Sequence, residues 1–310
     1  MHFLRLIRYQ NLLLLALMQL IFHYGFLQKQ IGGLAPELAL NDWQFLLLVL
    51  STVCIAGGGY VINDVFDKNM DKINKPERVI IDKHITEAAA YNFYIVLNVI
   101  GVGIGFYLSN FIGKPSFSTI FILIAATLYL YAMNLKKSLL AGNVLIAAML
   151  AISVLIVGVF DLLPIITPEN QHSLGNLFKI IIDYAVFAFL INLIREIIKD
   201  MEDIEGDLDN GSKSLPIVIG IKKTKIALSV LLILSILLLG WYSYTYFFEN
   251  DLYIVLIYVL ALVLTPLVYI VVRLWEANQK KDFTHLSLVL KAIILFGILS
   301  LLVIVNTVGL

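Results

Sequence analysis

Residues 44–63 read QFLLLVLSTVCIAGGGYVIN, and residues 64–71 continue as DVFDKNMD. The first stretch contains no Asp, Glu, Lys or Arg. It has the length of about 20 residues that an α-helix needs to cross the hydrocarbon core of a bilayer. The second stretch carries three aspartates and one lysine. Together they predict a membrane-spanning helix that ends in an acidic segment at the membrane surface.

The rest of the 310-residue chain repeats these long apolar runs. Residues of the AVILMFWYC set make up 60% of the chain and charged residues only 14%, against roughly 45–50% and 25% in typical soluble domains. This composition argues against a soluble enzyme, a nucleic-acid-binding protein or a disordered chain. We expect an all-α polytopic membrane protein, a bundle of nine transmembrane helices with residues 1–310 as a single domain. The predicted spans are approximately 11–28, 44–63, 91–110, 117–134, 139–160, 177–195, 225–247, 252–273 and 288–308.

The lysines and arginines are divided unequally between the two ends of these spans. One end collects 19 of the 22, and the other holds only Lys29, Lys114 and Lys179. Cytoplasmic loops of membrane proteins carry the excess of basic residues. We therefore expect a multi-pass protein of the cell's inner or plasma membrane with a cytoplasmic N-terminus.

Two acidic ladders lie on the predicted cytoplasmic side. In each, three aspartates follow the helical spacing i, i+3, i+7, which places side chains on one face if the helix continues past the membrane. In the first ladder, Asn63 lies four residues before Asp67. In the second ladder, Glu196 lies four residues before Asp200. The first ladder is Asn63, Asp64, Asp67 and Asp71, and the second is Glu196, Asp200, Asp203 and Asp207.

Such ladders need a cation. Two carboxylates about 4 Å apart repel each other by roughly 4 kcal/mol at an effective dielectric near 20. Mg²⁺ prefers oxygen ligands and is usually held by a few carboxylates together with substrate phosphates. The predicted magnesium ligands are Asn63, Asp64, Asp67, Asp71, Asp200, Asp203 and Asp207. The alternatives are a solvated acidic face and an ion pathway, although the acids gather at one interface and only Asp183, which has no assigned role, lies well inside a span.

The paired motifs resemble those of a known family. Asn63-Asp64-x-x-Asp67-x-x-x-Asp71 and Asp200-x-x-Asp203-x-x-x-Asp207 are similar to the two aspartate-rich motifs of the UbiA superfamily of intramembrane prenyltransferases. The resemblance covers the whole chain and implies nine helices around a central cavity. It also implies Mg²⁺-dependent transfer of a polyprenyl group from its diphosphate to an acceptor, with the active site facing the cytoplasm.

Further positions extend the resemblance. Tyr131 and Lys136 fit the family's Tyr-x-x-x-x-Lys, which implies a place near the allylic carbon and the diphosphate, and Asn11 fits part of its N-terminal motif. Segment 72–78, Lys-Ile-Asn-Lys-Pro-Glu-Arg, resembles the archaeal branch that transfers geranylgeranyl groups to geranylgeranylglyceryl phosphate. Segment 79–83, Val-Ile-Ile-Asp-Lys, departs from that branch, which leaves the acceptor open.

The resulting hypothesis is prenyl transfer between two lipophilic substrates at the membrane. The catalytic candidates are Asp67, Asp71, Asp200, Asp203 and Tyr131, and the substrate-binding candidates are Asn11, Asn63, Lys75, Arg78, Lys136, Arg195 and Lys199. Aromatic faces at Tyr60, Phe66 and Tyr131 could stabilise an allylic cation. The partners are a polyprenyl diphosphate, a lipophilic acceptor and membrane lipid, with no nucleic acid and no obligatory protein partner. The acceptor is a prenylglycerol phosphate or, alternatively, an aromatic acid or quinone precursor, and a transporter of cations or organic acids is the more distant reading.

Overall fold

The computed structural model describes residues 2–32, 37–74, 76–77, 79–209 and 211–308. Within these ranges the chain forms helices joined by short loops and no strand, and an isolated bridge links Ile81 to Ile85. The α-helices are α1 (His2–Leu6), α2 (Tyr9–Leu20), α3 (Gln28–Gln30), α4 (Asp42–Phe66), α5 (Lys68–Asn74), α6 (Glu87–Phe111), α7 (Ser118–Met133), α8 (Ala141–Asp161), α9 (Gln171–Glu202), α10 (Ile204–Asp209), α11 (Leu215–Ile219), α12 (Ile221–Ser243), α13 (Tyr253–Val259), α14 (Thr265–Glu276) and α15 (Lys280–Val308).

Short 3₁₀ and π segments connect several of these helices. The 3₁₀ turns are η2 (Pro115–Phe117), η3 (Leu135–Lys137) and η4 (Leu163–Ile165), and the π segments are η1 (Ile21–Leu27), η5 (Tyr244–Phe248) and η6 (Leu260–Leu264). Because the π segments continue the neighbouring α-helices, α2 runs through η1 into α3, and α13 runs through η6 into α14. Several α-helical segments therefore join into one continuous rod, and the bundle contains fewer rods than α-helices.

The described residues contain nine helical rods that are long and apolar enough to cross a membrane, which confirms the predicted number. The sixth is longer than predicted: α9 spans 32 residues, whereas the apolar run covers only 177–195. Polar residues continue the helix at both ends, and the C-terminal extension carries Glu196 and Asp200. The second acidic ladder therefore begins on the same rigid rod that crosses the membrane.

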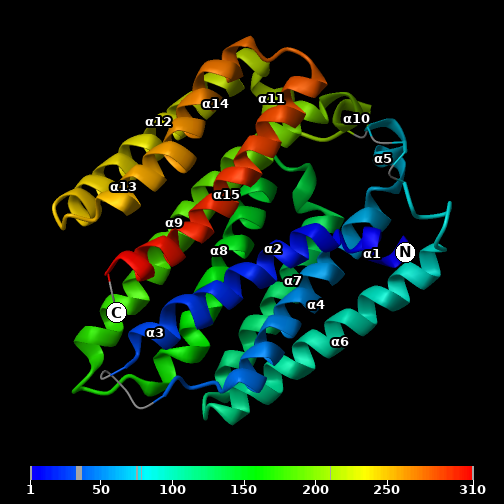
Figure 1. Cartoon of the computed structure of the whole chain (residues 1–310). Helices are drawn as coiled ribbons and strands as arrows, with labels where there is room; N and C mark the ends of the chain where they lie inside the picture. Colours follow the sequence, from blue (N-terminus) through cyan, green and yellow to red (C-terminus); the bar gives the residue numbers. More distant parts are fainter. Residues whose placement is uncertain (1, 33–36, 75, 78, 210, 309–310) are drawn as a thin grey trace.

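The rods form two groups joined by a central pair. Helix α4 packs against α6 and α7, while α12 packs against α9, and α13 and α14 pack against α15. Helices α2 and α8 contact each other, and they join the two groups because α2 also packs on α4 and α8 on α9. Figure 1 shows this arrangement, with α4, α6 and α7 on one side of α2 and α15 on the other. The central cavities described below lie between these groups.

Glycines allow the close approach of α4 and α6. A Cβ added at Gly101 would lie 2.6 Å from Ile55 Cγ1 and 2.9 Å from the Ser51 carbonyl oxygen. The Ser51 hydroxyl donates a 2.6 Å hydrogen bond to the Gly101 carbonyl, so the two backbones are nearly in contact. Small residues at helix interfaces are the usual means of such packing in membranes.

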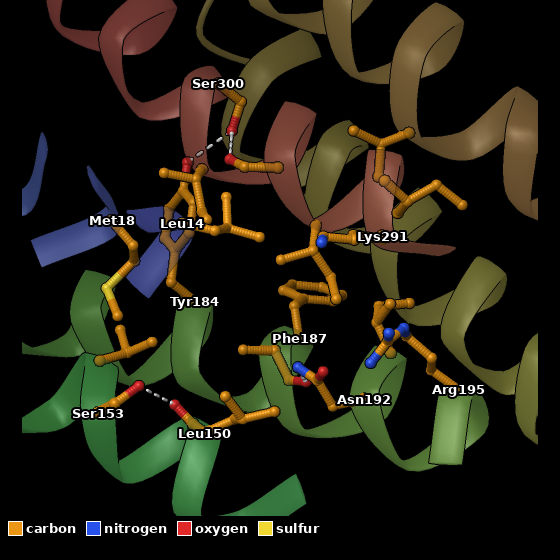
Figure 2. Close-up of a pocket in the computed structure, with 18 of the residues that line it drawn as sticks. Leu14, Met18, Leu150, Ser153, Tyr184, Phe187, Asn192, Arg195, Lys291 and Ser300 are labelled. Atoms are coloured by element: carbon orange, nitrogen blue, oxygen red, sulfur yellow. Dashed lines mark hydrogen bonds between the residues drawn. The ribbon is translucent and has the colours of Figure 1, made fainter. Parts of the chain in front are cut away.

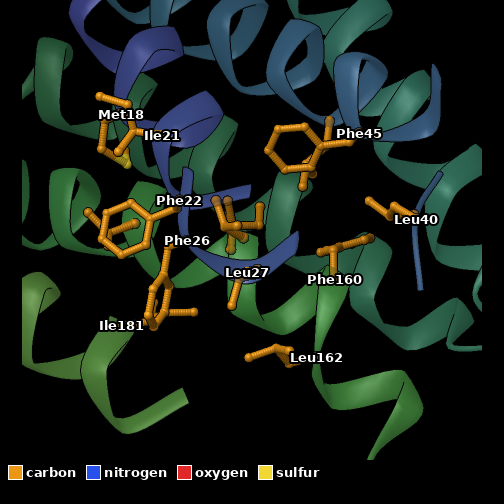
Figure 3. Close-up of a cluster of buried hydrophobic side chains, with 14 of the residues drawn as sticks. Met18, Ile21, Phe22, Phe26, Leu27, Leu40, Phe45, Phe160, Leu162 and Ile181 are labelled. Atoms are coloured by element: carbon orange, nitrogen blue, oxygen red, sulfur yellow. The ribbon is translucent and has the colours of Figure 1, made fainter. Parts of the chain in front are cut away.

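A buried ionisable pair lies near the end of the bundle where α4 begins. His23 Nδ1 and Asp161 Oδ2 are 2.8 Å apart, and neither residue is exposed. The His23 ring stacks on Phe45, the fourth residue of α4, with ring centroids 3.7 Å apart. Figure 3 shows the surrounding apolar cluster, which includes Phe45 and Phe160. This end of the bundle is closed by packing.

The opposite end of α4 carries the acidic segments. Helices α1, α5, α10 and α11 lie at this end together with the N-terminus, and the C-terminus lies at the other (Figure 1). The short helices α5 and α10 pack against each other. The two acidic ladders, about 130 residues apart in the sequence, are thus brought to one place.

Candidate active site

The first ladder begins at the end of α4 and reaches Asp71 in the first turn of α5. Helix α4 ends at Phe66, Asp67 is its C-cap, and α5 begins at the next residue. The helical hydrogen bond from the Asp71 amide to the Asp67 carbonyl, 2.8 Å, is nevertheless kept. The break between α4 and α5 therefore keeps Asp67 and Asp71 in the i, i+4 relation that the sequence predicts. Asp67, at the break, is buried.

Asp64 and Asp67, the two carboxylates of the first ladder at the end of α4, each have a side-chain partner. Asn63 Nδ2 donates a 2.6 Å hydrogen bond to Asp67 Oδ2, as the predicted i, i+4 spacing requires. Lys136, from η3, forms an ion pair with the same Asp67 oxygen. Arg8, just before α2, donates a 2.8 Å hydrogen bond to Asp64. Three segments that are distant in the sequence therefore meet at the end of α4.

The second ladder is built in the same way. Helix α9 ends at Glu202, Asp203 is its C-cap, and α10 begins at Ile204. The Asp207 amide donates to the Asp203 carbonyl at 3.1 Å, which parallels the Asp71–Asp67 bond. Each ladder is thus interrupted at its second aspartate. This shared break is not visible in the spacing.

The α9 side of the site also has its carboxylates partnered. Asn143 Nδ2, from the first turn of α8, donates a 2.8 Å hydrogen bond to Asp200 Oδ2. Lys199 donates a 2.6 Å hydrogen bond to Glu196 Oε1, and Arg195 lies 3.5 Å from the same oxygen. Asn143 is not among the site residues predicted from the sequence. It directly follows Gly142, which allows α8 to approach η3 closely.

Burial and mutual repulsion shape the acid–base properties of the loop aspartates. Burial, followed by the neighbouring Asp67 and Asp64 carboxylates, raises the pKa of Asp71 to about 6. Burial likewise raises the pKa of Asp207 to about 6; Lys136 opposes this shift and Asp203 adds to it. A raised pKa means that the charged carboxylate is disfavoured. A cation bound between the ladders would remove that penalty.

The donor set fits a hard divalent cation such as Mg²⁺. Carboxylates and an amide oxygen are the ligand types that Mg²⁺ prefers. Asn63 Oδ1 is buried and accepts no hydrogen bond from the described residues, so one amide oxygen remains available in the first ladder. In the arrangement seen here, no group of three or more His, Cys, Asp or Glu side chains among the described residues is close enough to hold a metal ion. Partners such as Arg8, Lys136 and Asn143 occupy the carboxylates instead.

Two cavities lead from this site into the bundle. The smaller, about 1060 Å³ of unfilled space including its mouth, is lined by site residues and by apolar side chains of α7 and α8. Its site residues are Arg8, Asn63, Tyr131, Arg195, Glu196 and Lys199. The larger, about 1530 Å³, extends between α2, α9 and α15 (Figure 2). Asn11, Tyr60 and Arg195 line both, so the cavities meet beside the carboxylates.

Most of the predicted site residues that the structure describes lie at this place. Asn11 donates a 3.3 Å hydrogen bond to the Tyr60 hydroxyl, and the Arg8 guanidinium lies 5.0 Å from the centre of the Tyr60 ring. Phe66 is 39% exposed and lines neither cavity. Lys75 and Arg78 lie outside the described residues. Arg8, which the sequence indicated as a basic residue of the N-terminus and as part of the N-terminal motif with Asn11, proves to be a direct partner of Asp64.

Residues 31–303 match the UbiA prenyltransferase family. The chain belongs to this family. It is accordingly a prenyltransferase and an integral, multi-pass membrane protein. The family membership decides against the transporter reading.

This UbiA family member resembles several known proteins in sequence and in structure. The chain is 31% identical to the protein called digeranylgeranylglyceryl phosphate synthase in Sulfurisphaera tokodaii, over 85% of this chain and 88% of that protein. A solved structure described as giving insights into digeranylgeranylglyceryl phosphate synthase in membranes is 26% identical, with a TM-score of 0.63, and covers 100% of this chain and 98% of its own. A UbiA homologue from Archaeoglobus fulgidus, bound to DMAPP and Mg²⁺, shares the fold at 16% identity, with a TM-score of 0.59 and coverage of 97% and 99%.

Proposed function

We propose that the protein transfers a geranylgeranyl group from its diphosphate to the hydroxyl of a prenylglycerol phosphate, in a Mg²⁺-dependent reaction. The observation that carries the proposal is the meeting of two carboxylate ladders, from α4–α5 and α9–α10, at the mouth of apolar cavities. The names of its relatives support the choice of substrates, since the most similar ones are called digeranylgeranylglyceryl phosphate synthase.

The proposed metal ligands come from both ladders. They are Asn63, Asp64, Asp67, Asp71, Asp200, Asp203 and Asp207. Bound there with the diphosphate, Mg²⁺ supplies Lewis-acid stabilisation of the negative charge that develops on the leaving group. The Archaeoglobus fulgidus homologue was solved with DMAPP and Mg²⁺, which supports the choice of metal. Asp67, Asp71, Asp200 and Asp203 are the carboxylates on which we expect turnover to depend most.

Basic side chains hold the diphosphate in this proposal. Lys136, Arg195 and Lys199 lie around the carboxylates, and Arg195 and Lys199 line the smaller cavity. Guanidinium groups bind phosphate oxygens in a bidentate manner, and ammonium groups act as point charges. Lys75 and Arg78, which follow the first ladder in the sequence, are proposed to extend this set.

Side chains that line the cavities act in the remaining steps. Tyr131 and Tyr60 line the smaller cavity, and their ring faces would stabilise the allylic cation that forms when the C–O bond breaks. Asn11 holds the Tyr60 hydroxyl. The apolar side chains of α7 and α8 exclude water, which would otherwise capture the cation and produce a prenyl alcohol. The acceptor hydroxyl oxygen then bonds to the allylic carbon, and its proton passes to the diphosphate that has left.

We further propose that the site faces the cytoplasm. The N-terminus and both acidic ladders lie at one end of the bundle, which is the end that carries most of the basic residues. Residues 1–310 would act as one unit in the cell membrane, because the two ladders and both cavities draw on helices from α2 to α15. The reaction requires neither nucleic acid nor a protein partner.

A direct assay tests the acceptor. Purified protein is given radiolabelled geranylgeranyl diphosphate and Mg²⁺, and either geranylgeranylglyceryl phosphate or 4-hydroxybenzoate. We expect a labelled diether product with the first acceptor and none with the second. Product only with 4-hydroxybenzoate would contradict the lipid acceptor and would favour the aromatic one.

A further inference from the structure

Lys291 is a cation inside a membrane-spanning helix. It lies eleven residues after the start of α15, and its half-buried side chain lines the larger cavity. Its Nζ donates a 2.8 Å hydrogen bond to Asn11 Oδ1, and it takes part in no ion pair within the described part of the chain. Charged residues at such positions are costly, and they face a water-filled cavity or a functional partner. The sequence indicated Lys291 only as part of the basic side of the membrane.

A second cation stands beside it. Figure 2 shows Lys291, from α15, and Arg195, from α9, on the same side of the cavity, with Asn192 next to them. The Arg195 side chain is 17% exposed, and its buried Nε has no hydrogen-bond partner among the described residues. Glu196 is shared between Arg195 and Lys199. One carboxylate therefore faces two cations, and Lys291 adds a third cation. The carboxylate in the lining of the larger cavity, Asp183, lies twelve residues before Arg195 on α9, toward Tyr184.

The rest of the larger cavity suits an apolar chain. Side chains such as Leu14, Met18 and Phe187 line its length, and Figure 2 places Tyr184 and Ser300 on the side away from the two cations. Tyr184 and Ser300 hydrogen-bond to each other at 2.7 Å. Tyr184 and Arg195 are eleven residues apart on α9, which corresponds to about 16 Å along a helix. The cavity thus combines a cationic head with a long apolar body.

We propose that the larger cavity holds the acceptor, with its phosphate monoester bound by Lys291 and Arg195 and its prenyl chain running toward Tyr184 and Ser300. A phosphate monoester carries a charge of about −1.5 to −2 near neutral pH, which matches two cations. This inference rests on the proposed function.

Lys291 belongs to the acceptor side alone, whereas Arg195, which lines both cavities, lies between the acceptor phosphate and the diphosphate. Lys291 lines only the larger cavity, whereas Lys199 and Glu196 line only the smaller one. Asn11, Tyr60 and Arg195 line both. An acceptor whose phosphate lies on Lys291 would have its glycerol hydroxyl at this junction, facing the allylic carbon of the donor. Lys291 is in this view a residue that selects a phosphorylated acceptor.

The test compares two acceptors that differ only in the phosphate. Wild-type enzyme, Lys291→Met and Lys291→Arg are assayed with geranylgeranylglyceryl phosphate and with the corresponding alcohol, geranylgeranylglycerol, at saturating donor. A hydrogen-bonded charge pair is typically worth enough to change binding by about tenfold to a hundredfold. We expect the preference for the phosphate in kcat/KM to fall by that factor in Lys291→Met and to be largely restored in Lys291→Arg. The loss should appear mainly in the KM of the acceptor.

The matched control is Lys281→Met, because Lys281 is an exposed lysine on the same helix and lines neither cavity. An unchanged preference in Lys291→Met overturns the inference, and so does a rise confined to the KM of geranylgeranyl diphosphate. A wild-type enzyme that does not use the phosphorylated acceptor at all overturns the proposed function as well. Thermal unfolding in detergent shows whether a variant has lost its fold. If Lys291→Met has, the acceptor preference of Lys291→Arg decides the test.

Discussion

Asp67 is the residue at which the contacts of the site converge. It is buried, it caps α4, it accepts a hydrogen bond from Asn63, and it pairs with Lys136. An asparagine at this position keeps an oxygen that accepts the hydrogen bond from Asn63 but loses the charge that pairs with Lys136, so the substitution tests the charge alone. Asp200 is the first aspartate of the second ladder and lies inside α9, where Asn143 donates a hydrogen bond to it.

Substituting these two aspartates tests the metal site. We expect Asp67→Asn and Asp200→Asn each to lower Mg²⁺-dependent turnover at least about a hundredfold, as is typical when a group that stabilises developing charge is removed. The measurement is prenyl transfer as a function of Mg²⁺ concentration. Asp209→Asn is the control, since Asp209 is an exposed aspartate on α10. Retention of both turnover and Mg²⁺ dependence in the two variants would show that the metal ligands lie elsewhere.

Sequence spacing predicts contacts within one helix but not contacts between distant segments. The Asn63–Asp67 bond follows directly from the i, i+4 spacing. The partners Arg8 and Asn143 come from elsewhere in the chain, and only the packing of α2 and α8 brings them to the carboxylates. Lys291 could not be recognised as a cavity residue because a single lysine barely changes the hydropathy of a long apolar run.

At the level of the elements, the site depends on short segments held between long rods. The turn η3 carries Lys136 and sits against the start of α8. Helices α5 and α10 are seven and six residues long, and they pack on each other beyond the rods. The nine rods are predictable from hydropathy, whereas the interruptions at Asp67 and Asp203 are not, because both sides of each break have helical spacing.

The contact between η3 and α8 can be tested at Gly142. A Cβ at this position would lie 2.8 Å from the Leu135 carbonyl oxygen and 3.2 Å from Lys136 Cα, both of which are backbone atoms that cannot turn away. We expect Gly142→Ala to displace Lys136 from Asp67, to destabilise the protein by about 1–3 kcal/mol, and to raise the KM of the prenyl diphosphate. Thermal unfolding and steady-state kinetics are the measurements.

The comparison variant for Gly142 is Gly240→Ala, because a Cβ at Gly240 would meet no atom within 4 Å. Both variants add one methyl group to a helix of the bundle. Equal behaviour of the two would mean that the approach of α8 to η3 does not position Lys136. A loss of stability without a change in KM would limit Gly142 to a structural role.

On the scale of the whole molecule, the two ends of the bundle differ in construction. The end with the N-terminus carries ion pairs, short helices and the mouths of the site, while the other is closed by the buried His23–Asp161 pair and the aromatic cluster around it. The odd number of rods places the two termini at opposite ends. The basic residues predict which end faces the cytoplasm, since they concentrate beside the site.

Labelling in intact cells tests this orientation. Cys54 is the single cysteine and is buried, so Cys54→Ser gives a background without thiols. On it, Asn250→Cys introduces an exposed thiol between η5 and α13, and Lys213→Cys introduces one between α10 and α11. A membrane-impermeant maleimide should label position 250 from outside and reach position 213 only after the cells are opened. The reverse pattern would place the active site outside the cell.

The pairing of Asp64, Asp67, Glu196 and Asp200 with side chains of the same protein has a consequence for how substrate is loaded. Arg8 and Lys136 offset the charges of Asp64 and Asp67, and Asn143 donates a neutral hydrogen bond to Asp200. Under the proposed function, Arg8, Lys136 and Asn143 would release these carboxylates to hold Mg²⁺, and Arg8 and Lys136 would be free to contact phosphate oxygens. Loading would therefore exchange one set of partners for another, and the departure of diphosphate would restore the original pairs.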